Sequence, residues 1–110
     1  MNRPLRIAKQ FYRDLDKALE YLEEHADERV VARFAAAVAS TRAHIRTFPE
    51  SGNRHYSSVL DTVELRMFPV TTFKYYLVFY LSGPDEIVLV RLLHGMRDLA
   101  TELEALDTSE

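Results

Sequence analysis

Cysteine is absent from the 110 residues, so the chain has neither disulfides nor thiolate metal sites. Only three glycines are present, and neither Gly-x-x-x-x-Gly-Lys nor Gly-x-Gly-x-x-Gly occurs, which excludes the common phosphate-cradling loops. No pair of histidines has the spacing of a zinc site, so we expect no metal and no cofactor. No apolar run approaches the roughly 20 residues of a membrane helix, and the N-terminus lacks a signal-like apolar segment. We therefore expect a cytoplasmic protein without membrane contact.

Acidic residues are concentrated at the C-terminal end of the chain, and the remainder is close to neutral. The net charge is −3, yet residues 98–110 alone hold five acids and no base. Residues 1–97 hold fourteen bases against twelve acids, which leaves a body of only +2. This surplus is too small for electrostatics alone to provide nucleic-acid binding.

The stretch from Glu86 to Asp98 organises the rest of the chain. Its residues 86–92 are dominated by Val, Ile and Leu, the pattern of a central strand buried on both faces. Gly95 and a polar cluster follow directly. Arg91 interrupts the apolar run, so it needs a carboxylate partner, either Glu64 or an acid of the helices, or must reach the edge of the sheet.

The preceding residues predict a strand, two helices and further strands. Periodicity predicts a strand at 4–8 and a helix at 9–24, with Asp14 among the solvent-facing residues. Asp27 is the expected N-cap of a second helix that ends near Thr47. A loop at 48–52 precedes strands at 63–68, 73–81 and 86–92, then a short helix with Leu99, Leu103 and Leu106.

These elements predict an α+β fold in a single domain spanning residues 1–110, with 107–110 frayed. It consists of an N-terminal strand, an antiparallel helix hairpin, a mostly antiparallel sheet of three or four strands, and a short C-terminal helix.

The polar residues after the last strand are the main candidates for a site. His94 and Arg97 could line a groove as acid–base and phosphate-binding groups, converging with Arg66 and His55. The alternative is structural: Asp98 caps the last helix and Arg97 pairs with a nearby acid.

Several segments together resemble one protein family. They are Phe48-Pro49-Glu50-Ser51-Gly52-Asn53-Arg54, Glu64-Leu65-Arg66, the aromatic strand 75–80, and Arg91-Leu92-Leu93-His94-Gly95-Met96-Arg97-Asp98. With the order β-α-α-β-β-β, they resemble the RelE/ParE toxins of bacterial type II toxin–antitoxin pairs over nearly the whole chain. The loop and the closing His-Gly-x-Arg-Asp are more similar to the ParE branch, the plasmid-stabilisation toxins.

The resemblance implies a cytoplasmic toxin that a cognate antitoxin neutralises. ParE-like members are associated with poisoning DNA gyrase, whereas RelE-like members cut mRNA in the ribosomal A site. On the RelE pattern, Arg97 and Arg66 match basic positions, but Tyr76 and Leu103 stand where a base and a Tyr are expected.

We therefore expect a ParE-like toxin that acts on gyrase by protein–protein binding, not by catalysis. The residues expected to contact partners are Arg91, Arg97, Tyr76 and Phe34. One alternative is a ribosome-dependent mRNA endonuclease that uses His94, Arg97 and Arg66; another is an inert member retained for antitoxin binding.

Overall fold

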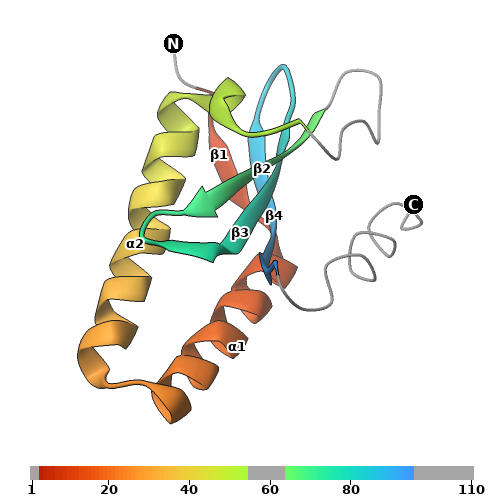
Figure 1. Cartoon of the computed structure of the whole chain (residues 1–110). Coiled ribbons are helices and arrows are strands. Elements are labelled where there is room, and N and C mark those ends of the chain that lie inside the picture. Colours follow the sequence, from red (N-terminus) through yellow and green to blue (C-terminus); the bar gives the residue numbers. More distant parts are fainter. Residues whose placement is uncertain (1–2, 55–63, 96–110) are drawn as a thin grey trace.

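The structure is a computed structural model that describes residues 3–54 and 64–95. Two helices and four strands make up most of this part of the chain (Figure 1). In chain order they are β1 (Leu5–Ile7), α1 (Lys9–His25), α2 (Glu28–Thr47), the 3₁₀ turn η1 (Pro49–Ser51), β2 (Glu64–Val70), β3 (Phe73–Ser82) and β4 (Ile87–His94). The expected α+β order is confirmed, while the helix expected around 99–106 lies outside the described residues.

The strand order in the sheet is β1-β4-β3-β2. β4 pairs in parallel with β1 and antiparallel with β3, and β3 pairs antiparallel with β2. The sheet is therefore mixed and mostly antiparallel, with β4 in an interior position. Its Ile87, Leu89 and Leu92 lie in the main core, whereas Val90 and Leu93 belong to a second cluster. The prediction of a strand buried on both faces is confirmed.

The helix hairpin lies across one face of the sheet (Figure 1). The Asp27 carboxylate accepts hydrogen bonds from the backbone N–H groups of Arg29 and Val30, so it caps α2 as expected. Phe11, Phe34 and Ile45 are at most 2% exposed in the core between the helices and the sheet. Burial of these apolar side chains holds the two layers together.

Alternation along β3 assigns its residues to two clusters. Val78 and Tyr80 lie in the main core with the helices, while Phe79 joins Leu65 and Leu93 in the second cluster. Phe73 departs from this alternation, because its ring lies edge-on to Phe34 at 5.1 Å, in the main core. The β2–β3 register shifts between Pro69 and Val70, next to the turn, which disrupts the two-residue period there.

The outer edge of β2 is partly closed to further strands. Asn53 exchanges two backbone hydrogen bonds with Met67, at 2.8 and 2.9 Å. The backbone groups of Met67 therefore point away from β3, and those of Pro69, two residues on, point the same way. Pro69 has no N–H to offer at that edge.

Within the described ranges 3–54 and 64–95, no helix combines the length and the apolar character needed to cross a membrane.

Candidate functional site

The segment 48–54, which links α2 to the residues before β2, is fixed to the sheet by a buried tyrosine. Tyr80 is fully buried, and its hydroxyl donates to the Pro49 carbonyl at 2.7 Å. The same hydroxyl accepts from the Gly52 N–H at 3.0 Å. A Cβ at Gly52 would collide with the Tyr80 ring and hydroxyl, so this close approach requires glycine. Burial raises the pKa of Tyr80 above its ordinary value.

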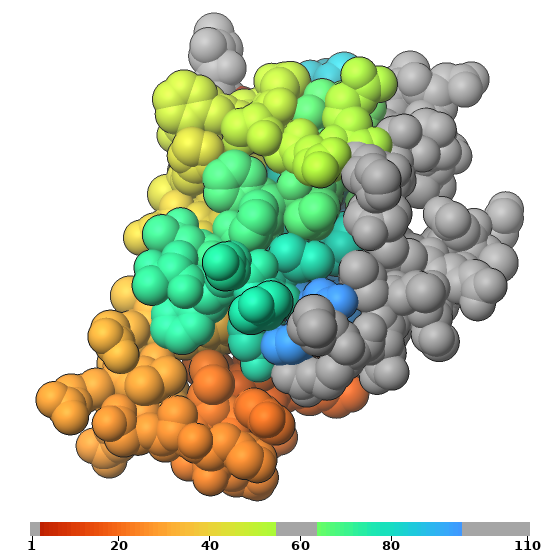
Figure 2. Space-filling view, in the orientation of Figure 1, coloured from red at the N-terminus to blue at the C-terminus, as the bar shows by residue number. Residues whose placement is uncertain are grey.

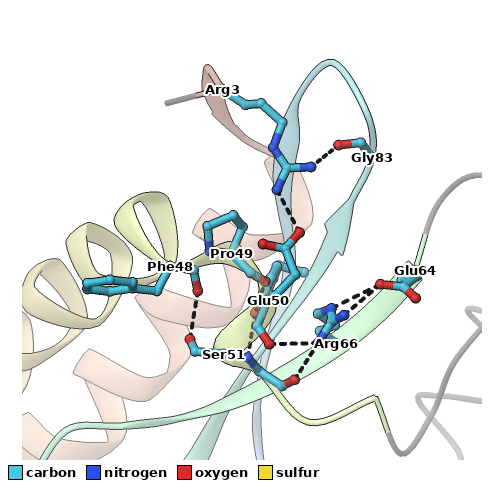
Figure 3. Close-up of polar contacts among 10 residues, drawn as sticks. Arg3, Phe48, Pro49, Glu50, Ser51, Glu64, Arg66 and Gly83 are labelled. Carbon is cyan, nitrogen blue, oxygen red and sulfur yellow. Dashed lines mark hydrogen bonds and ion pairs between the residues drawn. The ribbon is translucent and has the colours of Figure 1, made fainter. Parts of the chain in front are cut away.

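Arg66 fixes the same segment from β2. Its Nη1 donates to the carbonyls of Glu50 at 2.9 Å and Gly52 at 2.8 Å, and its Nη2 contacts the Glu64 carboxylate at 2.7 Å (Figure 3). Only 8% of the Arg66 side chain is exposed. The hydrogen bond from Arg66 lowers the pKa of Glu64 below its ordinary value. Arg66 thus makes internal contacts with segment 48–54 and Glu64.

Two further ion pairs neutralise charges of the segment. Arg3 contacts the Glu50 carboxylate at 3.1 Å and also donates to the Gly83 carbonyl (Figure 3). Arg54 contacts Glu64 at 3.0 Å.

A second buried polar contact joins α1 to β4. Arg91 donates from Nε to Asp14 Oδ2 at 2.8 Å and from Nη2 to Oδ1 at 3.2 Å. Asp14 also accepts from the backbone N–H of Leu92 at 2.9 Å and from Gln10 at 3.0 Å. Beyond Leu89 the β1 strand no longer covers this edge of β4, and the Asp14 carboxylate replaces it as acceptor.

The structure confirms one expectation about this contact and contradicts another. An acid of the helix hairpin was one of the two partners foreseen for Arg91, and the structure selects it over Glu64. The expectation of a solvent-facing Asp14 is wrong, because its side chain is 5% exposed. With 12% exposure of its own side chain, Arg91 is turned toward Asp14 and offers little surface to a partner.

His94 lies at the end of β4 in an aromatic group. Its ring is edge-on to Tyr76 at 5.0 Å and stacked with Tyr75 at 6.1 Å. Tyr76 in turn lies edge-on to Phe34 at 4.8 Å. Phe34 is fully buried, so its side chain does not reach a binding surface, and the partner contact expected of it is not supported. Tyr76 is half-buried, and its partner contact stays a prediction.

The structure does not bring His94 and Arg66 together. Arg66 pairs with Tyr80 along β3, and His94 pairs with Tyr76, four residues away. Four strand residues span about 13 Å, and the two side chains come from strands on opposite sides of β3. The expected convergence is therefore wrong for these two residues. Arg97 and His55 lie outside the described residues.

No group of three or more His, Asp or Glu residues that could hold a metal ion occurs in the described part of the chain. Sequence reasoning missed the role of Tyr80 as an anchor and the burial of Asp14. Only Asp14 left a signal: it stands three residues after Phe11 and four before Ala18, at the border of the apolar stripe.

Comparisons with known structures identify the fold. A chain of the chromosomal ParDE TA system from P. aeruginosa has a TM-score of 0.67 at 11% identity, with 84% of this chain and 95% of that chain covered. A chain of the archaeal RelE-RelB complex from Pyrococcus horikoshii OT3 has a TM-score of 0.56 at 17% identity, with 89% and 100% covered. The protein thus has the α+β fold of RelE/ParE-like proteins.

Residues 5–99 match the family model described as ParE toxin of type II toxin-antitoxin system, parDE. The chain belongs to this ParE toxin family, as its sequence resemblance indicated. No curated protein matches it in sequence.

Proposed function

We propose that the protein is the toxin of a type II toxin–antitoxin pair, that it inhibits DNA gyrase by protein–protein binding, and that a cognate antitoxin neutralises it. Membership of the ParE family supports the toxin assignment. The ParDE and RelE-RelB similarities support an antitoxin partner, since both names are those of such pairs.

The observation that carries the choice of mechanism is the burial of Arg66. A nuclease needs cationic and acid–base groups that converge on the scissile phosphate. Arg66 instead donates to two backbone carbonyls and one carboxylate. It also lies far from His94 along the sheet. This geometry favours binding over phosphodiester cleavage.

The alternative function is a ribosome-dependent mRNA endonuclease, which the similarity to the RelE-RelB complex leaves open. In that mechanism His94, Arg97 and Arg66 would provide the chemistry. Each transition-state contact of this kind typically contributes about 10²–10⁴ in rate.

Two readouts after induction without antitoxin separate the functions. We expect purified toxin to inhibit gyrase supercoiling in vitro, while primer extension finds mRNA uncut at A-site codons. The variants that test for nuclease activity are His94→Ala and Arg97→Ala, and of these His94→Ala should keep the inhibition. The endonuclease would be established instead if the wild type cuts mRNA at A-site codons, if these cuts disappear in either variant, and if gyrase is not inhibited. If cells grow normally when the protein is induced, it would be an inert family member that is retained only for antitoxin binding.

A further inference from the structure

An aromatic patch lies where α2 meets the anchored segment 48–54, with His44 and Phe48 exposed and Phe68 half-buried against the main core. It consists of His44, Phe48 and Phe68, and the ring of His44 lies 5.2 Å from that of Phe48 and 4.8 Å from that of Phe68. Phe48 is 57% exposed, and in Figure 3 its ring points away from the polar contacts of the segment. Segment 48–54 forms the upper part of the face in Figure 2, yellow-green above the strands. Phe48 differs from a single exposed apolar residue because its ring adjoins that of His44, and contiguous apolar patches mark interaction sites.

The backbone around Phe48 is held on both sides. Its N–H donates to the His44 carbonyl at 2.8 Å. Its carbonyl accepts from the Ser51 N–H at 3.0 Å and from the Ser51 hydroxyl at 2.7 Å. Hydrogen bonds from Tyr80 of β3 and Arg66 of β2 then hold the next two carbonyl groups, those of Pro49 and Glu50. A side chain presented on such a rigid support loses little conformational entropy on binding.

The charges around the patch favour a protein partner over a nucleic acid. Arg3 and Arg54 are paired with carboxylates, and Arg66 is buried. Arg42 and Arg46 are exposed, but two helical steps of 100° turn each of them away from the side of α2 that carries His44. Phosphate binding draws its affinity from cations that are available to the backbone. An apolar anchor whose neighbouring arginines Arg3, Arg54 and Arg66 are already held in ion pairs matches instead the centre of a protein–protein contact.

The patch also lies apart from the sheet edge that is open to an added strand. Asn53 and Pro69 obstruct the outer edge of β2, which is next to the patch. On the opposite edge of the sheet, the backbone groups of Leu5 and Ile7 point away from β4. An antitoxin segment that pairs as a strand would therefore use β1.

We propose that the aromatic patch of His44, Phe48 and Phe68 is the surface with which the toxin engages its protein target, with Phe48 inserted into an apolar pocket of that target. This inference rests on the proposed function. It goes beyond it by assigning the target-binding surface and by separating that surface from the antitoxin site.

The test compares Phe48→Ala with Tyr12→Ala, in which an aromatic side chain of similar exposure, 52%, is removed from α1. Each full-length variant is induced in cells without antitoxin and assayed for gyrase supercoiling. Its affinity for the antitoxin encoded beside it is measured by calorimetry. We expect Phe48→Ala to weaken growth arrest and gyrase inhibition by at least about tenfold, as removal of a central anchor does. Tyr12→Ala should stay within about twofold of the wild type, and antitoxin affinity should be unchanged in both variants.

Two controls separate a loss of target binding from a loss of folding: urea unfolding of each variant, and a second substitution at Phe48. Phe48→Leu retains an apolar side chain and should recover part of the activity if insertion into a pocket is the cause. Undiminished arrest by Phe48→Ala overturns the inference, as does a parallel loss of antitoxin affinity, which would assign the patch to the antitoxin. Loss of folding in both Phe48 variants also overturns it, since the side chain would then be structural.

Failure of the proposed function can be distinguished from failure of this inference. If the wild type arrests growth without inhibiting gyrase, the target assignment fails, and relief of the arrest by Phe48→Ala still supports the patch. If the wild type has neither effect, both proposals are overturned.

Discussion

Asp14 supports the junction of α1 and β4, because its buried carboxylate accepts three hydrogen bonds from Arg91 and Leu92 of β4 and another from Gln10 of α1. Asp14→Ala leaves the Arg91 guanidinium and the Leu92 N–H without their acceptor in a buried place. We expect a loss of about 3–5 kcal/mol in the free energy of unfolding, because the buried guanidinium loses the carboxylate with which it pairs. Urea denaturation measures it.

The matched control for this change is the double variant Asp14→Leu with Arg91→Met, which removes both charges and keeps apolar volume. It should recover most of the loss, because a buried ion pair contributes little net stability over well-packed apolar side chains. A loss below about 1 kcal/mol in Asp14→Ala would mean that water reaches Arg91 freely.

Tyr80 gives the stability of the protein a dependence on alkaline pH. Because burial raises its folded-state pKa, the native state holds the phenolic proton more tightly than the unfolded state does. The resulting stability is fully present below pH about 10, the ordinary value for tyrosine, and is lost as the pH rises above it.

We expect Tyr80→Phe to lose about 1–3 kcal/mol at neutral pH, since the Pro49 carbonyl and the Gly52 N–H lose their partner. Above pH 10 the difference from the wild type should shrink. Parallel urea titrations at pH 7 and above pH 10 test this, and a constant difference would contradict the raised pKa.

At the scale of elements, β4 contributes buried apolar side chains to both clusters of the core. Leu89 is 1% exposed in the main core, and Val90, half-buried, packs against the second cluster. Leu89→Ala should cost about 2–5 kcal/mol through lost apolar burial and the cavity left behind. Val90→Ala should cost clearly less, because its side chain is smaller and partly exposed. Equal losses in urea denaturation would argue against the interior position of β4.

At the scale of the whole molecule, two polar anchors tie the helix hairpin to the sheet. Asp14 joins the start of the hairpin to β4, and Tyr80 with Arg66 joins the segment after α2 to β3 and β2. Both anchors use buried side chains that make long-range contacts in sequence. The hairpin is thus fixed at its beginning and just beyond its end, while the turn at Asp27 lies away from the sheet (Figure 1).

The sequence by itself determined the element order, the helix boundaries near Asp27 and Thr47, and the interior strand at 86–92. These features depend on local signals: capping residues, apolar period and β-branched composition act over a few neighbouring positions. The resemblance to RelE/ParE toxins came from the same short segments, and the family match confirms it.

Only the tertiary structure decided the partners of the polar residues. Arg66 was expected to converge with His94 and instead contacts segment 48–54, and Asp14 was expected to face solvent and is buried. Arg91 and Asp14 are 77 residues apart, and Tyr80 and Pro49 are 31 apart. Such pairs form because a buried polar group must find an acceptor or donor wherever the packed chain provides one. Which one it finds depends on the docking of α1 and segment 48–54 onto the sheet, which local sequence does not encode.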